Sequence, residues 1–182
     1  MNLMQKIYQT KRLDLKILDS SHASLVLDYY RRNRVFLAEW ESLKPIDFYT
    51  LAYQAEELEY ELACIEQETR FRLWIFKKGV EDRTIGCFGF SNIVRGAFLS
   101  CFLGYKLDEA EINNGYMTEA VQKGIEIIFN QFNLHRIEAN IMPKNKRSLR
   151  VVEKLGFYNE GVAYKYWKWE DHIHNILLND KV

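Results

Sequence analysis

One stretch of eight residues combines glycine, two asparagines and threonine in a pattern suited to binding an anion. It reads Asn113-Asn114-Gly115-Tyr116-Met117-Thr118-Glu119-Ala120. Free N–H groups at the start of a helix, with the positive end of the helix dipole behind them, attract a phosphate or another anion. Gly115 would let the backbone approach a phosphate closely, and Asn113 and Asn114 tolerate left-handed geometry. An ordinary turn with a helix cap is the alternative interpretation, and one glycine does not decide between the two.

Two further segments place polar or glycine residues at predicted element boundaries. Asn145-Lys146-Arg147-Ser148 directly follows a predicted strand and opens a predicted helix. Lys154-Leu155-Gly156-Phe157 ends that helix, with Gly156 at the position where glycine commonly terminates one. A basic cluster in this region could meet phosphate groups or form a solvated helix face. It consists of Lys144, Lys146, Arg147 and Arg150.

Aromatic and histidine side chains near the C-terminus form the third candidate group. Strand alternation predicts Tyr164 and Tyr166 on one face and Trp167 and Trp169 on the other. Either pair could line a channel or pack on the sheet. His172 and His174 are two residues apart. Because no Cys, Asp or Glu completes a metal site by spacing, no metal is predicted.

The elements that must position these groups follow from hydrophobic periodicity. The octet lies between a strand-like stretch and a central helix, because apolar residues recur at helical spacing from 120 to 132. Strands are predicted at 10–18, 70–77, 84–94, 97–107, 136–142, 157–169 and 172–178, with a turn at 170–171. Further helices are predicted after an N-cap at 19–21, and at 33–40, 50–68 and 146–155. The helix at 50–68 is expected to bury Leu51, Ala55, Leu58, Leu62 and Ile65 and to expose its glutamates to solvent.

Length and composition limit the classes of protein to consider. The 182 residues fit one mixed α/β domain spanning 1–182. Lys and Arg number 25 and Asp and Glu number 25, so bulk charge does not favour nucleic-acid binding. No apolar run approaches the length of a membrane span, and no membrane partner is predicted. Three widely spaced cysteines in apolar segments indicate buried, reduced thiols and a cytoplasmic protein.

Several of these segments together resemble the GNAT N-acetyltransferases of the RimJ/RimL type, which acetylate N-terminal residues of ribosomal proteins. The resemblance is carried by Thr10-Lys11-Arg12-Leu13, residues 33–40 and 113–120, His135-Arg136-Ile137, residues 142–148 and Lys154-Leu155-Gly156-Phe157. It implies an α/β (α+β) fold with a central, mostly antiparallel mixed sheet. This sheet would be splayed beside the central helix, with flanking helices and acetyl-CoA in the cleft.

The resemblance also implies binding residues. Acetyl-CoA would contact Tyr105, Leu107, Asn113, Asn114, Gly115, Tyr116, Met117, Thr118, Asn145 and Ser148. Asn145 is expected on the pantetheine arm, with an Asx-turn after Pro143 as the alternative. The acceptor would contact Asn33, Trp40, Tyr164 and Tyr166.

The catalytic groups implied by the resemblance are a backbone N–H near Tyr105, which would polarise the thioester carbonyl, and the hydroxyl of Ser148. Many relatives protonate the leaving sulfur with a tyrosine at the position of Val152, so Ser148 is predicted to take this role. Its alternative is a hydrogen bond to the backbone at the helix start. RimL-like relatives place a glutamate at the position of Trp167. The base therefore stays open, with Glu138, Glu119 and Glu170 as candidates through a water.

The function implied is transfer of acetyl from acetyl-CoA to a primary amine. The amine attacks the thioester, a tetrahedral intermediate forms, and the CoA thiolate leaves. The expected acceptor is a protein or peptide N-terminus, such as that of a ribosomal protein. An acetyl-CoA-binding sensor or assembly factor without turnover, and a drug or polyamine acetyltransferase, are the alternatives. Either a monomer or a homodimer is compatible with the sequence.

Overall fold

A central sheet of eight strands organises the computed structural model, which describes residues 6–167 and 170–179. The strand order is β1-β2-β3-β4-β5-β6-β8-β7. The strands are β1 (Ile7–Gln9), β2 (Leu13–Lys16), β3 (Phe71–Lys77), β4 (Thr84–Val94), β5 (Ser100–Leu107), β6 (Arg136–Ile141), β7 (Tyr158–Trp167) and β8 (Glu170–Leu178). Of the recorded strand pairings, β5–β6 is parallel and the others are antiparallel, which confirms the predicted mixed, mostly antiparallel sheet.

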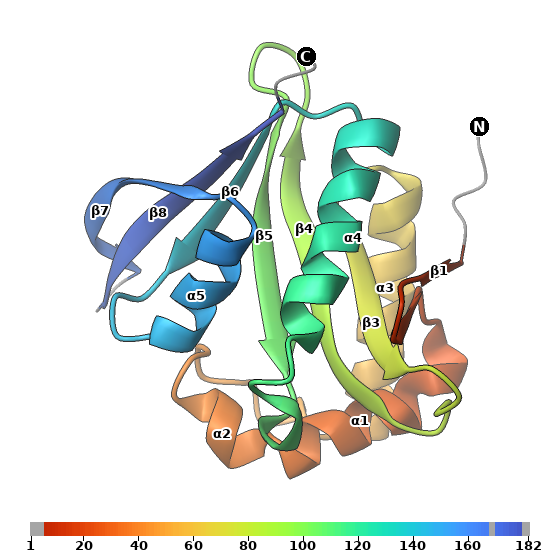
Figure 1. The fold of residues 1–182 in the computed structure, drawn as a ribbon. Helices are drawn as coiled ribbons and strands as arrows, with labels where there is room; N and C mark the ends of the chain where they lie inside the picture. Colours follow the sequence, from red (N-terminus) through yellow and green to blue (C-terminus); the bar gives the residue numbers. More distant parts are fainter. Residues whose placement is uncertain (1–5, 168–169, 180–182) are drawn as a thin grey trace.

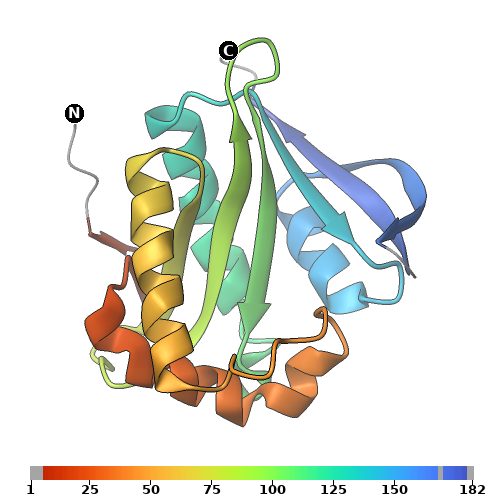
Figure 2. The same cartoon turned by 180° about the vertical axis from the view of Figure 1, so that it is seen from behind.

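Helices cover both faces of the sheet (Figures 1 and 2). They are α1 (Ala23–Arg32), α2 (Arg34–Ala38), α3 (Leu51–Glu66), α4 (Tyr116–Gln131) and α5 (Lys146–Lys154), with 3-10 turns η1 (Ser20–His22) and η2 (Glu109–Glu111). Apolar residues of α4 and α5 form one core with the sheet, and those of α1, α2 and α3 form a second core on the other side. We refer to these sides as the α4 face and the α3 face.

Helix α4 has the apolar face that its periodicity predicts, and it lies against the middle of the sheet. Its own residues Ala120, Val121 and Ile128 are fully buried against the sheet. At Gly124 a Cβ atom would come within 2.3 Å of the Phe88 ring on β4. Glycine at this position therefore allows the helix to approach the sheet closely, and the start of α4 is fixed relative to β4 and β5.

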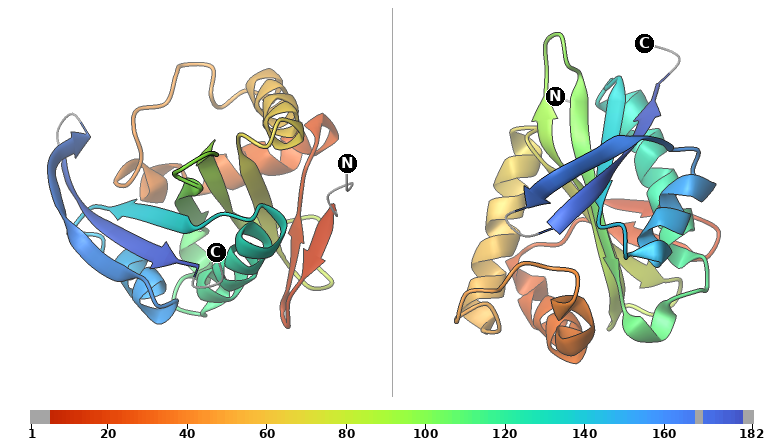
Figure 3. Two further views of the ribbon diagram at one scale, coloured as in Figure 1. Left: turned by 90° about the horizontal axis from the view of Figure 1, so that it is seen from above. Right: turned by 90° about the vertical axis from the view of Figure 1, so that its left-hand side faces the viewer.

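Strands β5 and β6 separate soon after they meet. They pair only where Ser100, Cys101 and Phe102 lie beside Arg136, Ile137 and Glu138. Beyond this point β5 continues along β4 to Leu107, whereas β6 continues along β8. Figure 1 shows the two strands diverging, and Figure 3 shows β6, β8 and β7 turning away from the rest of the sheet. The predicted splay is thus confirmed.

The first predicted strand, at 10–18, is instead the second half of a short hairpin. Thr10 N–H donates to the Leu13 carbonyl at 2.9 Å and closes the turn between β1 and β2. Strand β5 also begins later than the predicted Ala97, because Gly96 and Leu99 have positive φ angles of 71° and 43°. Such angles interrupt an extended strand.

The buried face of α3 also differs from the predicted stripe. Leu51 is 54% exposed, whereas Glu61 is only 8% exposed. Glu61 can be buried because its ion pair with Arg72 on β3 offsets the cost of removing the carboxylate from water. The expectation that all glutamates of this helix are solvated is therefore wrong at Glu61.

The C-terminal hairpin departs from simple alternation. Glu170 and Asp171 belong to β8 and not to the predicted turn. The register shifts between Ala163 and Trp167, and Lys165 has a φ angle of 51°. The predicted division of the aromatic side chains between two faces of the strand stays a prediction, because it depends on the two tryptophans. Trp169 and the side chain of Trp167 lie outside the described part of the chain.

Two expectations from composition can be compared with the fold. Cys64, Cys87 and Cys101 are free and buried, as predicted. Within residues 6–167 and 170–179, no helix is both long enough and apolar enough to cross a membrane.

Candidate active site

The turn predicted to bind an anion has the left-handed backbone geometry expected from its sequence. Asn113 and Gly115 have φ angles of 64° and 76°, both in the left-handed region. Gly115 is the N-cap of α4 and has no side chain to cap the helix, so it leaves N–H groups of the first turn free for another acceptor. The first intrahelical bond runs from Glu119 N–H to the Gly115 carbonyl at 3.1 Å. The turn therefore fits an oxygen-rich anion.

Arg12 supplies a cation beside this turn. Its guanidinium donates to the Asn114 carbonyl at 3.0 Å and to Glu119 at 2.6 Å, and lies 4.5 Å from the centre of the Tyr116 ring. A Cβ at Gly115 would be 3.5 Å from its Nη2. The sequence places Arg12 within the first predicted strand, and no local pattern indicates that it contacts Asn114 and Glu119, more than one hundred positions away.

The carboxylate of Glu119, one of the candidate bases, is held by hydrogen bonds from the β1–β2 turn. Its carboxylate accepts hydrogen bonds from the Thr10 hydroxyl at 2.6 Å and from Arg12 N–H at 2.8 Å. Burial opposes ionisation, but these hydrogen bonds hold the pKa of Glu119 below its ordinary value. Glu119 thus anchors the β1–β2 turn to α4, and this position does not favour it as a proton acceptor.

The free edge of β5 presents backbone donors to the opening between β5 and β6. Asp108 N–H donates to the Ile85 carbonyl at 2.7 Å, and the register pairs Phe88 with Tyr105. In an antiparallel ladder, hydrogen-bonded pairs alternate with pairs whose N–H and C=O groups point away. Counting back from Asp108, Tyr105 and Leu107 belong to the second kind, so their N–H groups face the opening.

Tyr105 and Ser148 are brought together across this opening. The Tyr105 hydroxyl donates to the Ser148 carbonyl at 2.8 Å, which ties β5 to the first turn of α5. Burial raises the pKa of Tyr105 well above its ordinary value, so the hydroxyl stays protonated at neutral pH. The two residues predicted to be catalytic therefore share one side of the opening, on the α4 face.

Asn145 caps α5 and leaves the Ser148 hydroxyl available. The Asn145 side-chain oxygen accepts from Ser148 N–H at 3.2 Å. This is the local bond that the Asx-turn alternative describes. Among the described residues, none forms a hydrogen bond with the Ser148 hydroxyl. The hydroxyl therefore does not cap the helix, and a role at the opening stays a prediction.

The basic cluster at the start of α5 is partly used for packing. The Arg147 guanidinium lies 5.1 Å from the centre of the Phe36 ring on α2. Lys146 and Arg150 are exposed on the helix. The cluster therefore reaches across to α2, and exposed cations remain on α5.

On the α3 face, the opening between β5 and β6 is bordered by β5 and by the segment after α2. Phe102, Gly104 and Lys106 alternate onto this face, and a Cβ at Gly104 would meet no atom within 4 Å. Lys106 forms an ion pair with Glu41 and lies 3.5 Å from the Tyr30 hydroxyl. The pair fixes the segment after α2 over β5, and Figure 3 shows that segment arching over the α3 face.

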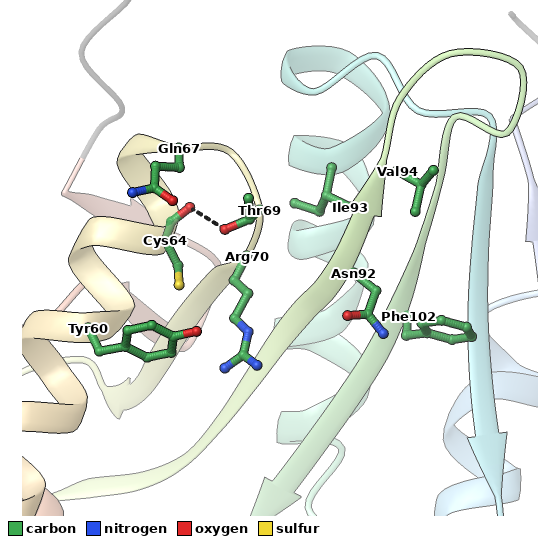
Figure 4. A pocket seen from close by; sticks show the side chains of 9 residues that line it. All are labelled: Tyr60, Cys64, Gln67, Thr69, Arg70, Asn92, Ile93, Val94 and Phe102. Carbon is green, nitrogen blue, oxygen red and sulfur yellow. Dashed lines mark hydrogen bonds between the residues drawn. The ribbon is translucent and has the colours of Figure 1, made fainter.

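A pocket of about 700 Å³ lies on the α3 face between α3 and the β4–β5 hairpin (Figure 4). Tyr60 and Arg70 line one side, and Asn92 and Phe102 line the other. The Arg70 guanidinium lies 5.5 Å from the centre of the Tyr60 ring. Since Phe102 is also the last β5 residue paired with β6, the pocket adjoins the opening. No sequence pattern indicates this pocket.

The residues predicted to contact the acceptor occupy different environments. Asn33 is 1% exposed, and its amide donates to the Tyr29 carbonyl at 2.9 Å and accepts from Glu109 N–H at 3.0 Å. Its geometry therefore supports a structural role between α1 and η2. Trp40 is half-buried just after α2. Tyr164 is 81% exposed on β7, and Tyr166 lies across the sheet from Asn140, with its hydroxyl 3.0 Å from the Asn140 amide nitrogen.

Comparisons with known proteins agree with this arrangement. Residues 12–158 match the acetyltransferase (GNAT) domain family. The chain belongs to the GNAT acetyltransferase family. It is therefore an acetyltransferase, and acetyl-CoA, the co-substrate of this family, is its acetyl donor. This confirms the resemblance recognised in the sequence.

Its relatives include proteins of the predicted subgroup. The chain is 36% identical over 177 residues to the ribosomal protein uS5-alanine N-acetyltransferase of Escherichia coli, covering 92% of this chain and 88% of that protein. It is 36% identical over 173 residues to the probable N-acetyltransferase YjcK of Bacillus subtilis, covering 93% and 95%. The crystal structure of ribosomal-protein-S5-alanine acetyltransferase from Vibrio fischeri has a TM-score of 0.91 and 33% identity, covering 97% of this chain and 98% of that one.

Proposed function

We propose that this acetyltransferase acts on the N-terminal α-amine of a protein, and that a ribosomal protein is the acceptor in the cytoplasm. The observation that carries the proposal is the 36% identity, over nearly the whole chain, to an enzyme named for alanine N-acetylation of ribosomal protein uS5. The exposed surface near the opening supports a polypeptide acceptor. Leu43 and Ile46, on the segment that arches over the α3 face, are fully exposed.

The acetyl donor and the acceptor are proposed to bind on opposite faces. The Gly115 turn, Tyr105, Asn145 and Ser148 all belong to elements on the α4 face, so we place acetyl-CoA there. Its pyrophosphate would meet the N–H groups at the start of α4, with Arg12 beside them. The acceptor then approaches from the α3 face, where Gly104 leaves β5 uncovered and the pocket lined by Arg70 and Phe102 adjoins the opening.

The proposed reaction is direct transfer. A neutral amine attacks the thioester carbonyl, whose oxygen accepts a hydrogen bond from the backbone N–H of Tyr105 as negative charge develops. The carbon–sulfur bond then breaks, and the leaving thiolate takes a proton from the Ser148 hydroxyl, which regains one from solvent, or from a water that Ser148 orients. The amine nitrogen loses one proton and the sulfur gains one, so acetylated amine and free CoA are the products.

An α-amine suits this site better than a lysine side chain. The ordinary pKa of an α-amine is about 8 and that of lysine about 10.4, so more of the α-amine is neutral at pH 7. We expect the highest kcat/KM with a peptide that begins with a small uncharged residue such as Ala or Ser.

The test measures release of the CoA thiol at pH 7 with matched acceptors. These are an Ala-started peptide, the same peptide blocked at its N-terminus but carrying a lysine, and a panel of polyamines and aminoglycosides. Faster turnover of the blocked peptide or of a small amine would contradict the proposed acceptor. Tight acetyl-CoA binding without thiol release for any amine would instead favour a sensor.

A further inference from the structure

A cluster of titratable side chains lies on the α3 face where β5 and β6 separate. Glu138 is the last β6 residue paired with β5, beside Phe102. Its neighbours Ile137 and Ala139 are fully buried in the core of the α4 face. Because side chains alternate along a strand, Glu138 and Asn140 point to the opposite face. Glu138 is therefore on the side proposed for the acceptor, at the level of the opening.

Polar contacts join Glu138 to residues of β6 and β8, and a β7 side chain packs on its partner. Its carboxylate is 3.2 Å from His174 Nδ1 and accepts from the Asn140 amide at 2.9 Å. Arg136 lies 3.3 Å from the second carboxylate oxygen. The Tyr166 ring packs edge-on against the His174 ring, with 4.9 Å between their centres. Glu138 and His174 thus form a pair held in place from three strands.

Two acceptor atoms of this cluster have no partner among the described residues. They are Nε2 of His174 and Oδ1 of Asn140, and both are buried. A carboxylate can only accept hydrogen bonds, so a neutral His174 next to Glu138 carries its proton on Nδ1. Nε2 then holds a free lone pair. Buried acceptors are rarely left unpaired, so a donor from a ligand or a bridging water is expected here.

We propose that His174, oriented by Glu138, accepts the proton that the attacking amine loses. This inference rests on the proposed function. As the carbon–nitrogen bond forms, the N–H proton passes to Nε2 of His174 through a bridging water, because Nε2 is buried. The Glu138 carboxylate stabilises the resulting imidazolium, which later releases the proton to solvent. His174 is thus the proposed catalytic residue and Glu138 its positioning residue.

The other described carboxylates near the opening are engaged elsewhere. Glu41 forms ion pairs with Lys44 and Lys106, and Glu61 pairs with Arg72. Glu119 is on the α4 face, bonded to Thr10 and Arg12. A neutral imidazole also offers a free ring nitrogen that can accept a proton, as general bases in enzymes do. The Glu138–His174 pair is therefore the arrangement best placed to receive the proton.

Other titratable side chains from the neighbouring strands surround the pair. They are Arg136 on β6, Glu160 and Tyr166 on β7, and His172 on β8. Glu160 is exposed and forms an ion pair with Arg136. The substitution Glu160→Gln is therefore a matched control, because it removes one carboxylate from the same network without touching His174.

The experiment compares His174→Gln, Glu138→Gln and Glu160→Gln in the pH profile of kcat/KM for an Ala-started peptide. We expect His174→Gln to lower kcat at pH 7 at least tenfold, to leave acetyl-CoA affinity unchanged and to remove the acid-side inflection due to the base. Glu138→Gln should lower kcat and move that inflection. Glu160→Gln should keep kcat within about twofold.

A second measurement separates chemistry from folding. The variant His174→Ala should regain activity when imidazole is added, which a purely structural defect would not do. Unchanged pH profiles and no rescue would overturn the proposal. If the wild-type enzyme prefers a small amine to any peptide, the same variants are measured with that amine. The proton-accepting pair is then judged separately from the proposed acceptor.

Discussion

The glycine at the start of α4 allows a sharp test of the acetyl-CoA site. Gly115 has a φ angle of 76°, where an L-residue costs roughly 1–2 kcal/mol. In the variant Gly115→Ala the new Cβ would lie 3.5 Å from Arg12 and beside the N–H groups proposed to hold a phosphate. A hydrogen bond to a charged group contributes about 1.5–3 kcal/mol. Loss of one such bond raises the Kd for acetyl-CoA about 10- to 150-fold.

Gly79, in the turn between β3 and β4, provides the matched control. Its φ angle is 77°, and a Cβ there would meet no atom within 4 Å. Gly79→Ala and Gly115→Ala should therefore lose similar stability in thermal denaturation. Only Gly115→Ala should lose affinity for acetyl-CoA in calorimetry at a temperature where both variants are folded. Equal acetyl-CoA affinity in the two variants would refute the assignment of the phosphate site.

Three further predictions follow from the site and the fold. Ser148→Ala should lower kcat by roughly a hundredfold with a smaller change in acetyl-CoA affinity, and wild-type turnover in steady-state assays would remove Ser148 from the mechanism. Burial opposes ionisation of Asp108, but hydrogen bonds from Arg32 and Arg83 hold its pKa below the ordinary value. The stability that ionised Asp108 contributes is then complete above about pH 4, and it is lost as the pH falls through the lower pKa of the folded state. Asp108→Asn should therefore make Tm depend less on pH at the acid side. A Tm profile as steep as that of the wild type would contradict this. Gly124→Ala should lower the free energy of unfolding by roughly 1–3 kcal/mol, because its Cβ would lie 2.3 Å from a phenylalanine ring, and an unchanged urea midpoint would show that α4 can shift.

Features that depend on local sequence could be predicted. The left-handed backbone at Gly115 follows from a glycine between a strand and a periodic helix. The burial of Ile137, Ala139 and Ile141 follows from simple alternation in β6. The proximity of Tyr105 to Ser148 came instead from the family resemblance, which places β5 beside the start of α5. Local pattern and resemblance together therefore predicted the fold, and they named residues that the structure brings together on the α4 face.

Features that depend on contacts between distant segments could not be predicted. Glu61 looks like a solvated helix residue until Arg72 is placed opposite it. The pairing of Glu138 with His174 requires β8 to lie between β6 and β7, and the order of strands in the chain does not indicate this. Likewise, the register shift around Lys165 occurs in a segment, residues 163–167, that has no glycine or proline to signal it.

The central claim is that the enzyme acetylates an N-terminal α-amine. The most direct measurement uses one peptide that begins with alanine and contains an internal lysine, incubated with the enzyme and acetyl-CoA at pH 7. Tandem mass spectrometry then locates the added acetyl group. We expect acetyl on the N-terminal alanine, with the lysine unmodified at early times. Acetyl on the lysine alone, at a rate set by the enzyme, would contradict it.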